Sequence, residues 1–163
     1  MALFDITYKE NYARMHSLAK KMMNDSDVAC DIVQDVFVSY YEKIQRGYVV
    51  EFPKNWLFRA VINKCIDYSA ARKSFVRLDD LPPGEDVCDD ATYSDKRQSE
   101  AIVRSAIRQL KSKEEIQLVL LYSERCSYKE ISEITGIKFT SVGKTLSRTL
   151  KKLREILKKM GYF

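Results

Sequence analysis

Apolar residues recur three or four positions apart along most of this chain, and alternating apolar and polar runs are scarce. The clearest stripe lies near the C-terminus and consists of Val142, Leu146, Leu150, Leu153 and Leu157. This spacing is typical of an amphipathic α-helix. Only 5 glycines and 3 prolines in 163 residues are available to interrupt such helices. The sequence therefore predicts an all-α fold.

The same periodicity predicts three helices in the first half, at about residues 4–23, 28–45 and 54–72. The segment 76–96 is different, because it is rich in acids and contains Pro82, Pro83 and Gly84. Helical periodicity resumes near Arg97. We therefore predict two small helical domains, residues 1–75 and 97–163, joined by an acidic flexible linker at 76–96.

Two sequences of the capping-box type begin short helices in the second half, Ser112 to Glu115 and Ser127 to Glu130. Gly136 is expected to end the second of these helices. The final helix follows, and its outer face is basic. A short helix, a turn with glycine and a second helix with a basic face indicate a helix-turn-helix. The alternative is a charged helix that is merely solvated.

Charge is distributed unevenly around a formal net charge of +5. From Gly136 to the end the chain has eight lysines and arginines against Glu155 alone. A basic end of this kind is expected to face a polyanion. The sequence Gly143-Lys144-Thr145 looks like the end of a phosphate-binding loop, but the required upstream glycine and preceding strand are absent. We therefore expect Lys144 to meet a DNA phosphate or base edge.

The sequence gives little support for a metal centre or for an enzyme active site. The four cysteines are far apart, no CxxC pair is present, and the chain has a single histidine, His16. We expect no bound metal, no cofactor and no catalysis by this chain. The N-terminal segment does not read as a signal peptide, and no apolar run is long enough to span a membrane. These features predict a cytoplasmic protein without membrane insertion.

Three quoted segments resemble one protein family. The segment "CSYKEISEITGIKFTSVGKTLSRTLKKLRE" resembles the C-terminal promoter-binding region of bacterial RNA polymerase sigma factors. "DVACDIVQDVFVSYYEKI" resembles the polymerase-binding helix of that family, and "FPKNWLFRAVINKCIDY" resembles its −10-element-binding helix. Two such blocks in this order, joined by an acidic linker, resemble the extracytoplasmic-function (ECF) group of the sigma-70 family.

The resemblance implies an alternative sigma factor that binds core RNA polymerase and directs initiation at specific promoters. Its polymerase-docking face would comprise Asp31, Gln34, Asp35 and Val38, while periodicity places the neighbouring Phe37 in the core. A cognate anti-sigma factor would be a further partner. The alternative is a helix-turn-helix regulator that binds duplex operator without polymerase and has an N-terminal sensor or partner-binding domain.

The resemblance also implies two sets of DNA-binding residues. The −10 set, which would capture an unstacked base, is Tyr48, Phe52, Trp56, Asn63 and Lys64. For Trp56 an ordinary core position is the favoured interpretation. The −35 set on the last helix is Thr140, Ser141, Lys144, Thr145, Arg148 and Lys151. Gly143 and Thr145 depart from the family, which usually has lysine and arginine there, so we expect weak affinity for DNA alone.

Overall fold

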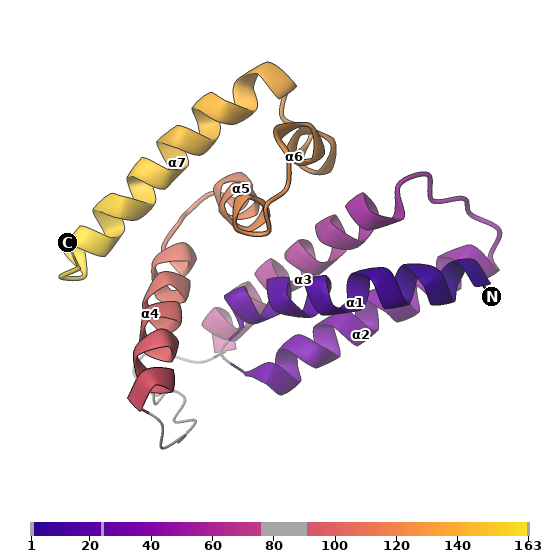
Figure 1. Cartoon of the computed structure of the whole chain (residues 1–163), viewed down its shortest axis with the longest axis horizontal. Coiled ribbons are helices and arrows are strands. Elements are labelled where there is room, and N and C mark those ends of the chain that lie inside the picture. The colour runs from indigo at the N-terminus through magenta and orange to yellow at the C-terminus, as the bar shows by residue number, and fades with distance from the viewer. Residues whose placement is uncertain (1, 24, 76–90, 163) are drawn as a thin grey trace.

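The computed structural model describes residues 2–23, 25–75 and 91–162, and these ranges fold into seven helices and no strand. The helices are α1 (Ala2–Met22), α2 (Ser26–Gln45), α3 (Pro53–Phe75), α4 (Ala91–Arg108), α5 (Lys113–Ser123), α6 (Tyr128–Thr135) and α7 (Phe139–Lys159). Figure 1 shows α1 to α3 grouped together and α5 to α7 stacked to one side of them. The predicted all-α fold is confirmed.

The first three helices, called here the N-terminal half, pack around a shared apolar core. Phe37 of α2 is 2% exposed, as its periodicity predicted, and Met15, Phe58 and Ile62 are fully buried beside it. Asp25 begins α2 as its N-cap, and its side chain accepts a hydrogen bond from the backbone N–H of Asp27. Burial of these large side chains supplies the main stabilisation of the bundle.

Helices α4 to α7, called here the C-terminal half, contain the predicted helix-turn-helix in α6 and α7. Ile131 and Ile134 of α6 pack with Val142 and Leu146 of α7, and all four are buried. Gly136 follows α6 with φ of +81°. This left-handed conformation favours glycine, and it confirms the predicted helix end.

Of the two predicted capping boxes, the structure forms the side-chain cap of only one. The Ser127 Oγ accepts a hydrogen bond of 3.1 Å from the backbone N–H of Glu130, so this cap is formed. Ser112 is the N-cap of α5 but makes no side-chain cap hydrogen bond. Glu115 instead accepts a hydrogen bond of 2.8 Å from Lys152 of α7. At α5, an ion pair with another helix therefore takes the place of the expected capping box.

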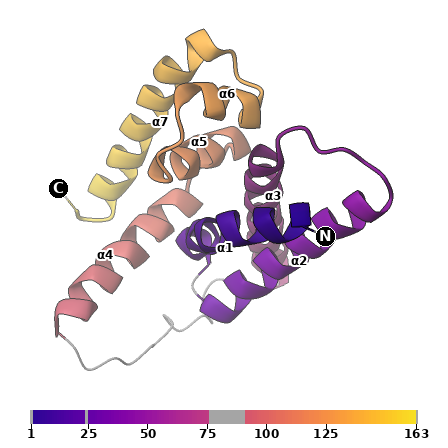
Figure 2. The same ribbon diagram turned by 45° about the vertical axis from the view of Figure 1, so that its right-hand side comes forward.

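The two halves pack against each other. Figure 2 shows α1 beside α4, and α3 beside α5 and α6. Helix α4 begins at Ala91, inside the segment 76–96 that we expected to be a linker. Residues 76–90, with most of the acids of that segment, lie outside the described residues, and the domain boundaries stay a prediction.

Candidate nucleic-acid interface

The polar face of α2 carries the predicted docking residues together. Asp31, Gln34 and Asp35 are exposed, and Val38 among them is 53% exposed. The opposite face of the helix is buried in the core. An exposed apolar residue ringed by polar ones suits a protein contact.

The connection between α2 and α3 presents apolar side chains to solvent. Gly47 ends the turn after α2 with φ of +87°, a conformation that favours glycine. Beyond it, Tyr48 is 61% exposed, Val49 is 92% exposed and Phe52 is 57% exposed. Three large apolar side chains exposed in one short loop are a composition that suits contact with another molecule.

Trp56, at the start of α3, lies partly in the core and partly at this loop. Its ring centroid is 5.7 Å from that of buried Tyr40, and its burial is intermediate. The Nζ of Lys43 lies 5.4 Å from the centroid of the Tyr48 ring and 5.8 Å from that of Trp56. Sequence reasoning missed Lys43, although it stands one turn after Tyr40. Its ammonium adds a cation–π contact and a positive charge to the loop.

Asn63 and Lys64 of α3, both expected to face DNA, differ in accessibility. The Asn63 Oδ1 accepts a hydrogen bond of 3.2 Å from Gln117 of α5, and the residue is half-buried. Lys64 is exposed, and its Nζ lies 3.4 Å from the Oδ2 of Asp35 on the docking face. In this arrangement the C-terminal half occupies the side of α3 that carries Asn63.

Helix α7 separates the predicted −35 residues into two groups. The side chains on its open face are Thr140, Lys144, Arg148 and Lys151. Ser141 and Thr145 are half-buried, and the Thr145 Oγ1 donates a hydrogen bond of 2.8 Å to the Ser141 carbonyl. These four predicted residues contribute three cations and one hydroxyl to the open face, a combination that suits phosphate and base-edge contacts.

Gly143, a small residue that we expected on the exposed face of the last helix, is half-buried in the structure. A Cβ at this position would lie 3.3 Å from Cε2 of Tyr128, the first residue of α6. The Tyr128 ring therefore lies over Gly143, and it is 45% exposed. Sequence reasoning missed Tyr128, and the unusual glycine was the available signal.

The described residues offer little that could bind a metal or act as a nucleophile. Among them, no group of three His, Cys, Asp or Glu side chains could hold a metal ion. Burial raises the pKa of the Cys65 thiol to about 12 and that of the Cys126 thiol to about 11. Thiols with such values are poor nucleophiles at neutral pH. None of the described helices is long and apolar enough to cross a membrane.

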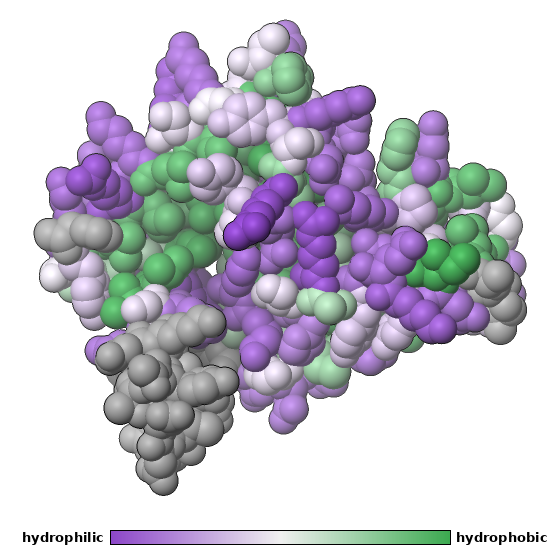
Figure 3. All heavy atoms as spheres, in the orientation of Figure 1, coloured by the Kyte–Doolittle hydropathy of each residue, from purple (hydrophilic) through white to green (hydrophobic). Residues whose placement is uncertain are grey.

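An apolar area is visible on the side of the molecule shown in Figure 3, over α4, α5 and α7. Val103 of α4 is 42% exposed, and Ile156 and Leu157 of α7 are half-buried. A pocket in the same region is lined by the apolar side chains of Leu110 and Ile156 and by charged ones that include Lys152, Glu155 and Lys159. Exposed apolar side chains beside charged ones suit a protein contact surface.

Comparison with known proteins assigns a family to both halves. A family model described as Sigma-70 region 2 matches residues 7–75, and one described as Sigma-70, region 4 matches residues 100–153. The chain is 27% identical over 165 residues to the ECF RNA polymerase sigma factor SigE of Mycolicibacterium smegmatis, a match that covers 98% of this chain. It spans 63% of the length of that relative.

Two further proteins are similar to this chain. The RNA polymerase sigma factor SigZ of Bacillus subtilis is 24% identical over 135 residues, which cover 83% of this chain and 76% of SigZ. Among solved structures, the sigma factor RpoE in complex with the anti-sigma factor NepR from Bartonella quintana matches with a TM-score of 0.63 and 20% identity. That match covers 97% of this chain and 98% of the other, and it shows a shared fold.

Proposed function

The chain belongs to the sigma-70 family of RNA polymerase sigma factors, within the extracytoplasmic-function group, and we propose that it binds core RNA polymerase and directs promoter-specific initiation of transcription. The observation that carries the proposal is the presence of both family regions in their usual order, at residues 7–75 and 100–153. A helix-turn-helix regulator of duplex operators would account only for the second region, so that alternative is not favoured.

The polar face of α2 is the proposed contact with core polymerase. Asp31, Gln34 and Asp35 would pair with basic and polar groups of the partner, and Val38 would be buried at their centre. Interfaces of this composition gain affinity from a desolvated apolar centre and specificity from the charges around it. The exposure of all four side chains supports this assignment.

The loop after α2 is the proposed receptor for an unstacked base of the −10 element. Tyr48 and Phe52 would stack on the base, Trp56 would form the floor, and Lys43 would lie near a phosphate. Stacking on an aromatic ring is worth about 1–3 kcal/mol per base. That range is comparable with the few kcal/mol needed to extrude a base. Asn63 and Lys64 would contact the adjacent strand.

The open face of α7 is the proposed reader of duplex −35 DNA. Thr140 and Lys144 lie in its first turns and would meet base edges, because recognition helices enter the major groove by their N-terminal end. Lys151 lies further along and would bind a phosphate, and Arg148, one turn after Lys144, would meet a base edge or a phosphate. Ser141 and Thr145 remain proposed members, and half-burial limits them to the edge of the contact.

In this proposal the polymerase performs the catalysis and the chain contributes recognition alone, in the cytoplasm and without a cofactor. A cognate anti-sigma factor is proposed as a further partner. The apolar area between α4 and α7 offers one surface for it (Figure 3). The solved structure of RpoE in complex with the anti-sigma factor NepR supports the proposal by analogy.

The test is in vitro transcription from a library of random promoters, with core polymerase alone and with core polymerase plus this protein. We expect transcripts from a small subset of sequences only when the protein is present. Start sites that do not change on addition of the protein would refute the proposal.

A further inference from the structure

Lys43, in the last turn of α2, lies beside the exposed loop because of the way that this helix ends. Gly47 donates a backbone hydrogen bond of 3.0 Å to the carbonyl of Ile44, and Tyr48 donates one of 3.2 Å to the carbonyl of Lys43 itself. The left-handed conformation of Gly47, with φ of +87°, permits this reversal of the chain. The backbone therefore brings Tyr48 back to Lys43.

The ammonium of Lys43 is close to two aromatic rings. Its Nζ lies 5.4 Å from the centroid of the Tyr48 ring and 5.8 Å from that of Trp56. Both distances fall within the roughly 6 Å over which the face of a ring attracts a cation. The Trp56 ring in turn packs on buried Tyr40, with 5.7 Å between the centroids. Lys43 is therefore near both rings of the proposed base receptor.

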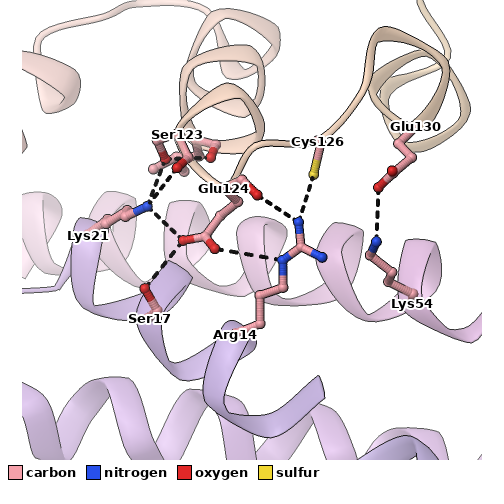
Figure 4. A network of polar contacts seen from close by, with 9 residues as sticks. Arg14, Ser17, Lys21, Lys54, Ser123, Glu124, Cys126 and Glu130 are labelled. Atoms are coloured by element: carbon pink, nitrogen blue, oxygen red, sulfur yellow. Dashed lines mark hydrogen bonds and ion pairs between the residues drawn. The ribbon is translucent and has the colours of Figure 1, made fainter. Parts of the chain in front are cut away.

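This ammonium has no carboxylate partner among the described residues. Other cations form the ion pairs of this part of the chain, and Figure 4 shows two of these pairs, Lys21 with Glu124 and Lys54 with Glu130. Lys43 is exposed and belongs to none of the pairs. A lysine without a carboxylate partner keeps its three N–H donors available for a ligand.

A base in this receptor would lie within reach of the Lys43 ammonium. Two stacked rings have their centroids about 4.5–7 Å apart, and Nζ lies inside that range from both Tyr48 and Trp56. A base stacked on either ring would bring its edge close to Nζ. The flexible four-carbon stem of lysine and its three rotatable donors can close the remaining gap.

The four bases differ in what they offer to such a group. Guanine presents O6 and N7 as neighbouring acceptors, and thymine and cytosine each have a ring carbonyl, whereas adenine has an amino group and no carbonyl. An ammonium donates hydrogen bonds and accepts none. It therefore pairs with carbonyl oxygens and gains nothing from the amino group of adenine. A contact with a phosphate through one N–H would leave two donors for the base.

We propose that Lys43 is a specificity-determining residue of the base receptor, and that it selects an unstacked base with a carbonyl group, namely guanine, thymine or cytosine, against adenine. The inference rests on the proposed function for its place in promoter recognition. Tyr48 and Trp56 supply stacking, which tolerates every base because every base has a π-face. The preference among bases then comes from the ammonium.

The binding test uses the full-length chain and its single tryptophan. Trp56 is the only tryptophan in the sequence, so its fluorescence reports occupation of the receptor without a label. The probes are short single-stranded oligonucleotides with an abasic backbone that carries one central guanine, thymine, cytosine or adenine. Quenching measured against probe concentration gives a dissociation constant for each base. A fully abasic oligonucleotide corrects for binding through phosphates alone.

We expect the wild-type protein to bind each carbonyl-bearing probe at least about fivefold more tightly than the adenine probe, the lower end of the discrimination that one good base contact provides. Lys43→Met keeps an unbranched side chain but has no donor, so its preference should fall below about twofold. Lys43→Arg keeps a cation with donors only and should retain the preference.

Lys20→Met is the matched control with the same loss of charge. Lys20 is an exposed residue near the end of α1, whereas the loop after α2 lies near the beginning of that helix (Figure 1). This variant should bind all four probes as the wild type does. A loss of base preference in Lys20→Met as well would overturn the inference, because net charge would then account for the effect.

Each further result decides the inference. Loss of the preference in Lys43→Met together with its retention in Lys43→Arg would support the inference. An equal loss of affinity for all four probes in Lys43→Met would overturn it, because a cation that only binds phosphate, or only positions the Tyr48 ring, does not distinguish bases. Equal affinity of the wild type for adenine and the other bases would also overturn it, as would the absence of quenching by every probe at millimolar concentration.

A transcription assay separates this inference from the proposed function. With core polymerase and the library of random promoters, the wild type should exclude adenine at one position of the −10 element. Lys43→Met should accept adenine there and keep its −35 preference. Unchanged exclusion of adenine in Lys43→Met would overturn the inference and leave the proposed function standing. If the wild type directs no transcription, the proposed function fails, while the fluorescence titrations still test the base preference of the loop.

Discussion

The ring of Tyr128 lies over Gly143, and a Cβ on that glycine would approach Cε2 of the ring to 3.3 Å. This distance is tight but the ring is 45% exposed, so it can tilt away by the few tenths of an ångström required. Glycine inside a helix costs about 1 kcal/mol relative to alanine. We therefore expect Gly143→Ala to raise the melting temperature by about 2–4 °C, measured by circular dichroism.

Gly136→Ala is the control, and it should lower the melting temperature instead of raising it. Gly136 has φ of +81° and nothing within 4 Å of an added Cβ, so the penalty there is conformational and not steric. A left-handed conformation costs an L-residue about 1–2 kcal/mol. A loss of stability in Gly143→Ala as well would show that the Tyr128 ring is fixed in place.

The second prediction concerns the docking face of α2. Asp35→Arg places a cation beside Lys64, whose Nζ now lies 3.4 Å from the Asp35 carboxylate. The two side chains are 67% and 45% exposed, and a surface pair of this kind is worth at most about 1 kcal/mol, so the fold should persist. Affinity for core polymerase should fall by at least about tenfold, or roughly 1.4 kcal/mol, in a titration followed by fluorescence anisotropy.

Asp5→Arg, an exposed substitution on α1 with the same change of charge, is the comparison for Asp35→Arg. It should leave the affinity for polymerase nearly unchanged. Equal losses in both variants would mean that net charge, and not the polar face of α2, governs the association.

Much of the fold could be predicted from sequence because burial of an apolar stripe is a local pattern. Phe37 illustrates this success, since its place in the stripe of α2 was enough to assign it to the core, where it is 2% exposed. Trp56 shows the limit. It is half-buried against Tyr40, and a single periodic pattern does not distinguish a core aromatic from one at the edge of a loop.

The contacts between the halves could not be predicted, because their partners are remote in sequence and polar. Arg14 and Glu124 are 110 positions apart, and each also fits an ordinary solvated helix surface. Ser112 fails as a side-chain cap for a related reason, since Lys152 of α7 engages Glu115. Asn63, expected to face DNA, is half-buried because Gln117 of α5 reaches it from the other half.

Arg148 on the open face of α7 gives a third prediction. If the guanidinium reads a base, Arg148→Ala should weaken binding to the matched −35 duplex by about 1–3 kcal/mol and leave mismatched duplexes less affected. If it touches phosphate, the loss should be uniform across sequences and the dependence of affinity on salt should decrease. Anisotropy titrations at several salt concentrations distinguish these outcomes.

Lys152→Ala is the matched control on the same helix. Its ammonium is already paired with Glu115 at 2.8 Å, so its removal should weaken DNA binding less than removal of Arg148. A larger loss in Lys152→Ala would mean that the DNA-facing side of α7 is centred on Lys152 and not on Arg148.

The ion pair between Lys54 of α3 and Glu130 of α6 predicts a pH dependence. Burial would raise the pKa of Glu130, but the hydrogen bond and charge of Lys54, at 3.1 Å, outweigh it and lower the pKa below its ordinary value of 4.5. A carboxyl with a lowered pKa stabilises the fold above its unfolded value, and this stabilisation is lost as pH falls through the lowered pKa.

The free energy of unfolding should therefore be higher for wild type than for Glu130→Gln above about pH 5, and the difference should close on further acidification. Lys54→Met removes the Lys54 contribution and leaves burial, which raises the pKa of Glu130, opposed by the charge of Arg14 and the hydrogen bond of Ser127. In that variant the pKa of Glu130 should rise relative to wild type, and the stabilisation gained on deprotonation should shrink. Denaturant titrations between pH 3 and pH 7 measure both trends, and an identical pH profile in wild type and Lys54→Met would contradict the assignment of Lys54 as the compensating charge.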